Sequence, residues 1–267
     1  MNEQIKALRK NFETLGTVYE PSEKVIIYKE NIRGVGCYWF HPAGREESDA
    51  GKLIIYLHGG GFVFGSIASH RALVSHVAEQ LATPVLFVEY RLAPEKPFSA
   101  AVDDVEKVYR QIRVQYPEKE IILMGDSAGG GLAVTALSRQ GMEAPAGLVL
   151  LSPWMDLTCS YESQMTNREH DPILRTEAIQ QYGAWYMGDA RLSEANPIET
   201  INRQFPPTLI LVGSDEILLD DSNKIAERQE RVRLTIYEHA NHVWMLENIH
   251  AEASQKALRE IREFIAG

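Results

Sequence analysis

The sequence predicts an α/β fold built on a mostly parallel, eight-stranded sheet with helices on both faces. The first observation is a series of eight short β-rich runs, at residues 25–28, 36–40, 53–57, 85–88, 121–124, 148–151, 208–212 and 232–237. The second is that, from the third run onward, these runs alternate with segments of helical periodicity. Strand and helix in alternation are typical of a parallel sheet that helices cover on both sides.

The first two runs differ from the rest because only the short segment 30–34 lies between them. That segment is too short for a crossover helix, so the sequence predicts an antiparallel pair there. The other six runs are apolar enough to be buried on both faces. Apolar residues spaced three or four apart predict the helices, for example Ile5, Leu8, Phe12 and Leu15; Ala101, Val105, Val108 and Ile112; and Leu258, Ile261 and Ile265.

Residues 154–206 interrupt the alternation between the sixth and seventh strands and are rich in aromatic side chains. We expect a small helical cap from this insertion, over the carboxyl edge of the sheet where parallel sheets place their ligands. Residues of about 1–20 are expected to contribute to the same cap. The alternative is that the aromatic side chains only pack the insertion against the body. The whole chain, 1–267, is interpreted as one domain.

Composition excludes several kinds of partner. With 37 acidic and 27 basic residues the net charge is −10, which disfavours nucleic acids and anionic membrane surfaces. The two cysteines, Cys37 and Cys159, lie far apart and indicate neither a disulfide framework nor a metal site. No apolar run approaches the roughly 18 residues of a membrane span. We expect a cytoplasmic protein without metal or cofactor, and a homodimer is one possibility.

Ser127 is the first candidate for a catalytic residue. It lies in the run 125–130 (Gly-Asp-Ser-Ala-Gly-Gly), between a predicted strand and an alanine-rich predicted helix. A strand that turns sharply into a helix strains the backbone of the serine, and flanking glycines relieve the crowding. The pattern therefore predicts a nucleophile elbow, although an ordinary glycine-rich turn is the alternative when the pattern stands alone.

A serine nucleophile needs a base and a group that orients the base. Asp215 follows the seventh predicted strand and His242 follows the eighth, so the chain order is the one expected for residues on loops of one such sheet. Asp220 and Asp221 compete with Asp215 for the role of acid. For the base, His239 is the alternative to His242.

Acyl transfer also needs N–H donors for an oxyanion, and the run 58–62 (His-Gly-Gly-Gly-Phe) follows the third strand. We assign Gly60 and Gly61 to this oxyanion hole, with Gly59 as a further candidate. The N–H of Ala128, directly after the nucleophile, is expected to contribute as well. A phosphate-binding loop is disfavoured because no lysine follows the glycines.

With these motifs in this order, the chain resembles the hormone-sensitive-lipase-like branch of the α/β-hydrolases. The resemblance is carried by the two glycine-rich runs, by 90–95 (Tyr-Arg-Leu-Ala-Pro-Glu), by 152–156 (Ser-Pro-Trp-Met-Asp), and by the loops around Asp215 and His242. It implies Ser127 as nucleophile, Asp215 as orienting acid and His242 as base. Within the run 90–95, Arg91 and Glu95 are interpreted as a buried structural brace.

The resemblance implies a cofactor-independent serine carboxylesterase that acts on small-molecule esters with short to medium chains. For substrate contacts we expect Phe62, Trp154, Trp185 and Trp244. An amidase or arylformamidase with the same triad, and a non-catalytic ligand-binding protein, are the alternatives. The chain departs from the family pattern in having Glu216 where a proline is common, and in having only 57 residues before His58, which predicts a reduced cap.

Overall fold

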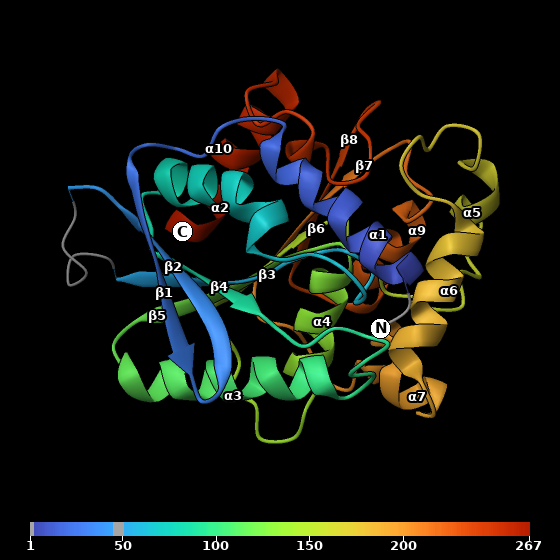
Figure 1. Ribbon diagram of the computed structural model, residues 1–267, viewed down its shortest axis with the longest axis horizontal. Helices are drawn as coiled ribbons and strands as arrows, with labels where there is room; N and C mark the ends of the chain where they lie inside the picture. Colours follow the sequence, from blue (N-terminus) through green and yellow to red (C-terminus); the bar gives the residue numbers. More distant parts are fainter. Residues whose placement is uncertain (1–2, 45–50) are drawn as a thin grey trace.

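The computed structural model describes residues 3–44 and 51–267 and contains an eight-stranded sheet in the order β1-β2-β4-β3-β5-β6-β7-β8 (Figure 1). The strands are β1 (Val25–Ile32), β2 (Val35–Pro42), β3 (Lys52–Leu57), β4 (Val85–Glu89), β5 (Glu120–Asp126), β6 (Gly147–Leu151), β7 (Thr208–Gly213) and β8 (Val232–Tyr237). β2 is antiparallel to both β1 and β4, and the other pairs are parallel. The predicted fold class and the antiparallel first pair are confirmed.

Helices cover both faces of this sheet. The helices are α1 (Glu3–Glu13), α2 (Ile67–Leu81), α3 (Ala100–Gln115), α4 (Ala128–Leu137), α5 (Ser163–Thr166), α6 (Thr176–Met187), α7 (Leu192–Ala195), α8 (Pro197–Thr200), α9 (Leu219–Arg228) and α10 (Glu252–Ala266), with 3-10 turns η1 (Thr14–Thr17) and η3 (Trp244–Leu246). α2 and α10 pack on one face, and α3, α4 and α9 on the other. Across the two described ranges, no helix combines the length and the apolar character that a membrane span needs.

The strand period of two divides the core into two layers. In β3, Ile54 and Tyr56 belong to the layer under α2 and α10, whereas Ile55 and Leu57 belong to the layer under α3 and α4. All four side chains are fully buried. Burying a large apolar side chain contributes about 1.5–3 kcal/mol, so this packing holds the central strands firmly in place. The loops of the site leave from the carboxyl ends of these strands.

The expectation that the last six strands are buried on both faces is wrong for β8. This strand lies at the edge of the sheet, next to β7 alone, and most of its residues are partly or fully exposed. Ile236, for example, is 45% exposed. Arg233 and Thr235 alternate with the apolar residues of β8, which is the pattern of a strand with one solvated face and not of a strand buried on both.

The N-terminal helix and the 154–206 insertion meet at the carboxyl edge of the sheet (Figure 1). Phe64 packs between them, with ring centroids 5.2 Å from Phe12 of α1 and 4.8 Å from Tyr182 of α6. Arg9 holds α1 in place by donating to the carbonyl oxygens of Val63 and Ala93 at 2.8 and 3.0 Å. Residues 1–2 of the predicted 1–20 cap element lie outside the described residues.

Arg91 and Glu95 do not form one buried brace, so this prediction is corrected. Arg91 is bound in a fork by the buried carboxylate of Asp104, with both nitrogen–oxygen distances at 2.7 Å. Glu95 pairs instead with Arg9 at 2.7 Å. The two charged residues thus hold different helices, α3 and α1, and both are partly exposed.

Gly129→Ala should destabilise the protein by about 3 kcal/mol or more, because a Cβ at this position would lie 2.0 Å from the backbone oxygen of Leu57. Backbone cannot move aside as a flexible side chain can. Urea denaturation followed by circular dichroism measures the effect. The control is Gly51→Ala, where a Cβ would have open space. Equal stability of the two variants would contradict the close approach.

Candidate active site

The backbone of Ser127 has the strained conformation predicted for a nucleophile elbow. The residue lies between the end of β5 and the start of α4 with φ of 50° and ψ of −122°. A Cβ on Gly125 would lie 2.5 Å from the backbone oxygen of Gly129. The small residues on both sides are therefore required by the sharp turn, which presents the serine hydroxyl at the sheet edge.

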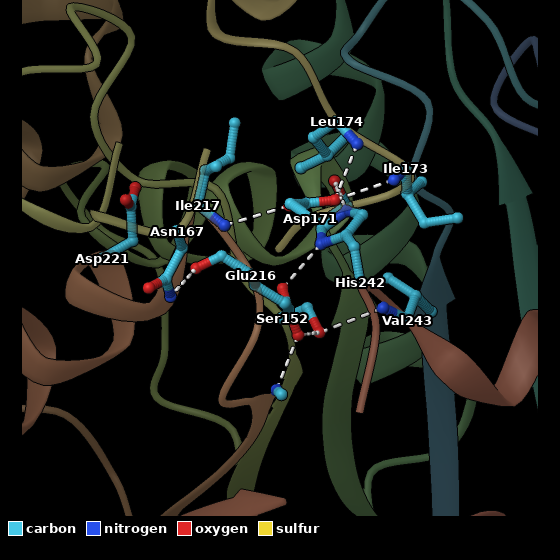
Figure 2. Close-up of polar contacts among 12 residues, drawn as sticks. Ser152, Asn167, Asp171, Ile173, Leu174, Glu216, Ile217, Asp221, His242 and Val243 are labelled. Atoms are coloured by element: carbon cyan, nitrogen blue, oxygen red, sulfur yellow. Dashed lines mark hydrogen bonds and ion pairs between the residues drawn. The ribbon is translucent and has the colours of Figure 1, made fainter. Parts of the chain in front are cut away.

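Three side chains from three separate loops form a hydrogen-bonded chain. Nε2 of His242 lies 2.9 Å from Oγ of Ser127. On the other side of the ring, Nδ1 of His242 lies 2.7 Å from Oε2 of Glu216 (Figure 2). All three residues are buried. These distances and this order have the geometry of a serine–histidine–acid triad, in which the acid orients the base.

The structure corrects the predicted acid: Glu216, and not Asp215, faces His242. Asp215 is partly exposed, accepts from Oγ of Ser214 at 2.7 Å, and lies 3.7 Å from His239 on the outside of the loop. Asp221 is also buried, but it accepts from the backbone N–H groups of Met155 and Asp156 instead. The loop after β7 turns Asp215 outward, and the longer glutamate one residue later reaches back to the histidine.

The buried carboxylate of Glu216 is held from two sides. Its Oε1 accepts hydrogen bonds from Oγ of Ser152 and from the N–H of Gly213, both at 2.6 Å (Figure 2). Its Oε2 is thereby aimed at Nδ1 of His242, which donates to it. A proton fixed on Nδ1 leaves Nε2 of the neutral ring free to accept the proton of Ser127.

The electrostatics around His242 favour its protonated form. Burial of the ring alone would lower its pKa, but the negative charge and hydrogen bond of Glu216, with smaller effects of Asp171 and Asp126, outweigh burial. The pKa is therefore raised above the ordinary value of 6.5. Since a base must be neutral before it takes a proton, activity is expected to rise with pH through a midpoint above this value.

The predicted oxyanion residues border the nucleophile. Gly60 and Gly61 have φ of 110° and 61°, and both line one cavity with Ser127. A Cβ on Gly60 would lie 2.3 Å from the backbone oxygen of Phe64, so the loop admits only glycine there. Ala128 is the first residue of α4, where the N–H has no acceptor inside the helix. Gly60, Gly61 and Ala128 therefore remain the candidate N–H donors beside Ser127.

A second buried charged group lies directly beneath the serine, and the sequence did not single it out. The Asp126 carboxylate accepts from the Tyr56 hydroxyl at 2.8 Å and lies 3.3 Å from Nε2 of His70, all fully buried. Burial would raise the pKa of Asp126, but His70 and Tyr56 lower it below the usual value. His70 lies on the buried face of α2 beside Leu73, Val74 and Val77, and a histidine on this apolar face was the available signal for the contact.

An apolar cavity of about 140 Å³ opens above Ser127 and His242. Its walls come from α1, the glycine loop, the 154–206 insertion and the region of η3: Phe12, Leu15, Gly60, Gly61, Phe64, Asp126, Trp154, Ile173, Leu174, Ile179, Tyr182, Leu218, Val243, Leu246 and Glu247. Of the four aromatic residues expected to contact substrate, Trp154 alone is in this lining.

The other three expected substrate contacts are corrected by their packing. The ring of Phe62 is fully buried and stacks on Tyr186 at 3.8 Å. Trp185 packs against Tyr182 with ring centroids 6.0 Å apart, and Trp244 packs against Tyr237 with ring centroids 4.7 Å apart. Phe62 and Trp185 thus pack against Trp154 and Tyr182, which do line the cavity. Several residues that line the cavity, such as Ile179 and Leu174, are aliphatic, and the aromatic composition of the insertion did not reveal them.

Comparison with known proteins places these features in a family. The sequence matches the alpha/beta hydrolase fold family over residues 54–246. The chain belongs to this family. An "Esterase" of Acinetobacter venetianus is 37% identical over 82% of this chain and 76% of its own length. An "Acetyl-hydrolase" of Streptomyces hygroscopicus is 38% identical over 71% of this chain and 64% of its own length.

Solved structures agree with the sequence matches. The crystal structure of an esterase from the bacterial hormone-sensitive lipase family superposes on this α/β-hydrolase with a TM-score of 0.90 and 33% identity, covering 96% of this chain and 89% of that one. The predicted resemblance to the hormone-sensitive-lipase-like branch is confirmed.

Glu216→Gln should lower kcat by a factor on the order of 10² to 10⁴, because the amide can no longer accept from Nδ1 of His242 without losing another bond. Asp215→Asn is the matched control, since it alters the adjacent carboxylate on the outside of the same loop. Its kcat should stay within about twofold of the unaltered enzyme. Hydrolysis of p-nitrophenyl butyrate measures both variants, and the reverse ranking would restore Asp215 as the acid.

Proposed function

We propose that this α/β-hydrolase is a serine carboxylesterase for small, uncharged esters, with Ser127 as nucleophile, His242 as base and Glu216 as orienting acid. The observation that carries the proposal is the hydrogen-bonded chain of 2.9 and 2.7 Å that ends at the floor of an apolar cavity. The printed names of the relatives, an esterase and an acetyl-hydrolase, support ester hydrolysis as the reaction.

The acylation step begins when Nε2 of His242 takes the proton of Ser127 and Oγ attacks the ester carbonyl carbon. The carbonyl oxygen gains negative charge as the carbon becomes tetrahedral. The N–H groups of Gly60, Gly61 and Ala128 stabilise this charge by donating hydrogen bonds to the oxygen. One such donor lowers the free energy of the transition state by about 2.7–4 kcal/mol. The imidazolium then protonates the alcohol oxygen, the carbon–oxygen bond breaks, and the acyl group stays on Ser127.

Deacylation uses the same groups with water in place of the serine hydroxyl. Neutral His242 takes a proton from water, the resulting hydroxide attacks the acyl carbon, and the oxyanion again forms beside Gly60 and Gly61. Collapse of this intermediate returns the proton to Oγ of Ser127 and releases the carboxylic acid. Glu216 stays ionised throughout and stabilises the imidazolium that appears in both steps.

The walls of the cavity indicate which esters fit. An apolar cavity of about 150 Å³ holds a group of the size of benzene, so a space of about 140 Å³ suits a short acyl chain. The ionisable side chains among its described lining residues are His242, Asp126 and Glu247, and Glu247 is exposed. The carboxylates of Asp126 and Glu247 would repel a negatively charged substrate, which favours uncharged esters.

Partners and location follow from charge and cysteine chemistry. The net charge of −10 opposes binding to nucleic acids. Cys37 and Cys159 are both buried and free, as expected of a protein that works in the reducing cytoplasm. The proposal therefore includes a cytoplasmic location and a small-molecule partner.

Ser127→Ala should abolish labelling by a fluorophosphonate and lower kcat about 10⁶-fold, because the covalent intermediate can no longer form. Labelling detected by intact mass, together with p-nitrophenyl butyrate hydrolysis, makes the test. The control is Ser138→Ala at the opposite end of α4, which should label and turn over normally. A labelled Ser127→Ala protein would contradict the assigned nucleophile, and faster hydrolysis of a matched formamide than of the ester would favour an amidase.

The cavity size predicts a preference for short chains. Each methylene gains up to about 0.8 kcal/mol while apolar wall is available, so kcat/KM should rise from p-nitrophenyl acetate to butyrate and fall for octanoate and palmitate. Ile179→Ala, which removes part of the wall, should move the optimum to a longer chain. Ile198→Ala, equally buried but outside the lining, is the control. Palmitate as the best substrate would contradict this pocket.

A further inference from the structure

We propose that Asp171, assisted by Asn167, is a positioning residue that holds the Glu216 loop against His242 and fastens it to the wall of the substrate cavity. The inference rests on the proposed roles of Glu216 and His242. Both new residues belong to the 154–206 insertion, far from Glu216 in sequence, and Figure 2 shows them grouped around the Glu216 loop.

The Asp171 carboxylate joins two segments with its two oxygens. Oδ1 accepts from the N–H groups of Ile173 and Leu174, both at 2.8 Å. Oδ2 accepts from the N–H of Ile217 at 3.0 Å, directly after Glu216. Ile173 and Leu174 line the cavity, so one carboxylate connects the part of the insertion that meets substrate with the backbone that carries the acid.

Asn167 binds the other side of the same loop. Its Nδ2 donates to the backbone oxygens of Ser214 and Glu216, at 2.9 and 2.8 Å. Together, Asn167 and Asp171 bind the backbone carbonyls of Ser214 and Glu216 and the N–H of Ile217. Local turn formation within the insertion would not require either of these contacts. Their contacts therefore hold the loop that carries Glu216. The amide of Asn167 donates to two backbone carbonyls of this loop, and the carboxylate of Asp171 accepts from one of its N–H groups.

Asp171 also acts through its charge, because it is 2% exposed and close enough to stabilise the protonated ring of His242. The charged groups that face this ring are Glu216 after β7, Asp171 from the insertion and Asp126 at the end of β5, and Glu247 lies on the wall of the same cavity. Removing the charge of Asp171 should move the midpoint of the pH profile to lower pH, since less negative charge remains to hold the proton.

The test compares Asp171→Asn, Asn167→Ala and Asp156→Asn with the unaltered enzyme, measuring kcat and KM for p-nitrophenyl butyrate from pH 5 to 9 and the melting temperature. Asp171→Asn should lower kcat about tenfold. It should also move the acid limb, the part of the pH profile where activity rises with pH, to lower pH by about half a unit. Asn167→Ala should lower kcat without moving that limb. Asp156 is the control because it is an equally buried carboxylate of the insertion that accepts from Thr158 and Ser160.

Asp156→Asn should lower the melting temperature and leave kcat and the pH midpoint unchanged. An Asp171→Asn enzyme with normal kcat and an unmoved limb would overturn the proposal, whatever its melting temperature. If that variant does not fold, a normal kcat for Asn167→Ala overturns it instead. Failure of the proposed function has a different signature, because the unaltered enzyme would then show no serine labelling or no acid limb.

Discussion

The active site depends on the close backbone contact between the nucleophile elbow and the strand beside it. Gly129 lies so near the oxygen of Leu57 that no side chain fits, and a Cβ on Gly59 would lie 2.3 Å from the Asp126 carboxylate. This contact brings the glycine loop after β3 alongside the serine after β5, two strands that are neighbours in the sheet. The sheet itself thus places the glycine loop beside the nucleophile.

Placing three carboxylates around one imidazole links activity and stability in opposite directions. The folded protein holds the His242 proton more tightly than an unfolded chain does, so the stabilisation from this charge is complete below the ordinary pKa and is lost as pH rises through the folded pKa. Catalysis needs the neutral ring and grows over the same interval. The lowered pKa of Asp126 works at the other end, since its stabilisation is lost as pH falls. The site is most active where the histidine contributes least to folding.

The sequence predicted the sheet, Ser127 and His242 because local patterns determine them: alternating periodicity, glycines at a sharp turn, and a histidine after the last strand. The acid was assigned to the wrong neighbour because local pattern does not decide which of two adjacent carboxylates turns inward. That choice depends on Ser152 after β6 and on the insertion, both remote in sequence. The aromatic residues were misplaced for a related reason, since composition shows that a segment is apolar but not which side chains face the cavity.

A glutamate as the acid accounts for the density of contacts around it. Glutamate has one more rotatable bond than aspartate, so holding its carboxylate in one direction costs more conformational entropy. Ser152 and Gly213 fix the carboxylate itself, and the insertion fixes the backbone beneath it. A shorter acid at position 215 would need fewer restraints but starts from a backbone that turns outward. The protein therefore reaches the histidine with a longer side chain, and the segment that walls the substrate cavity also keeps that side chain in place.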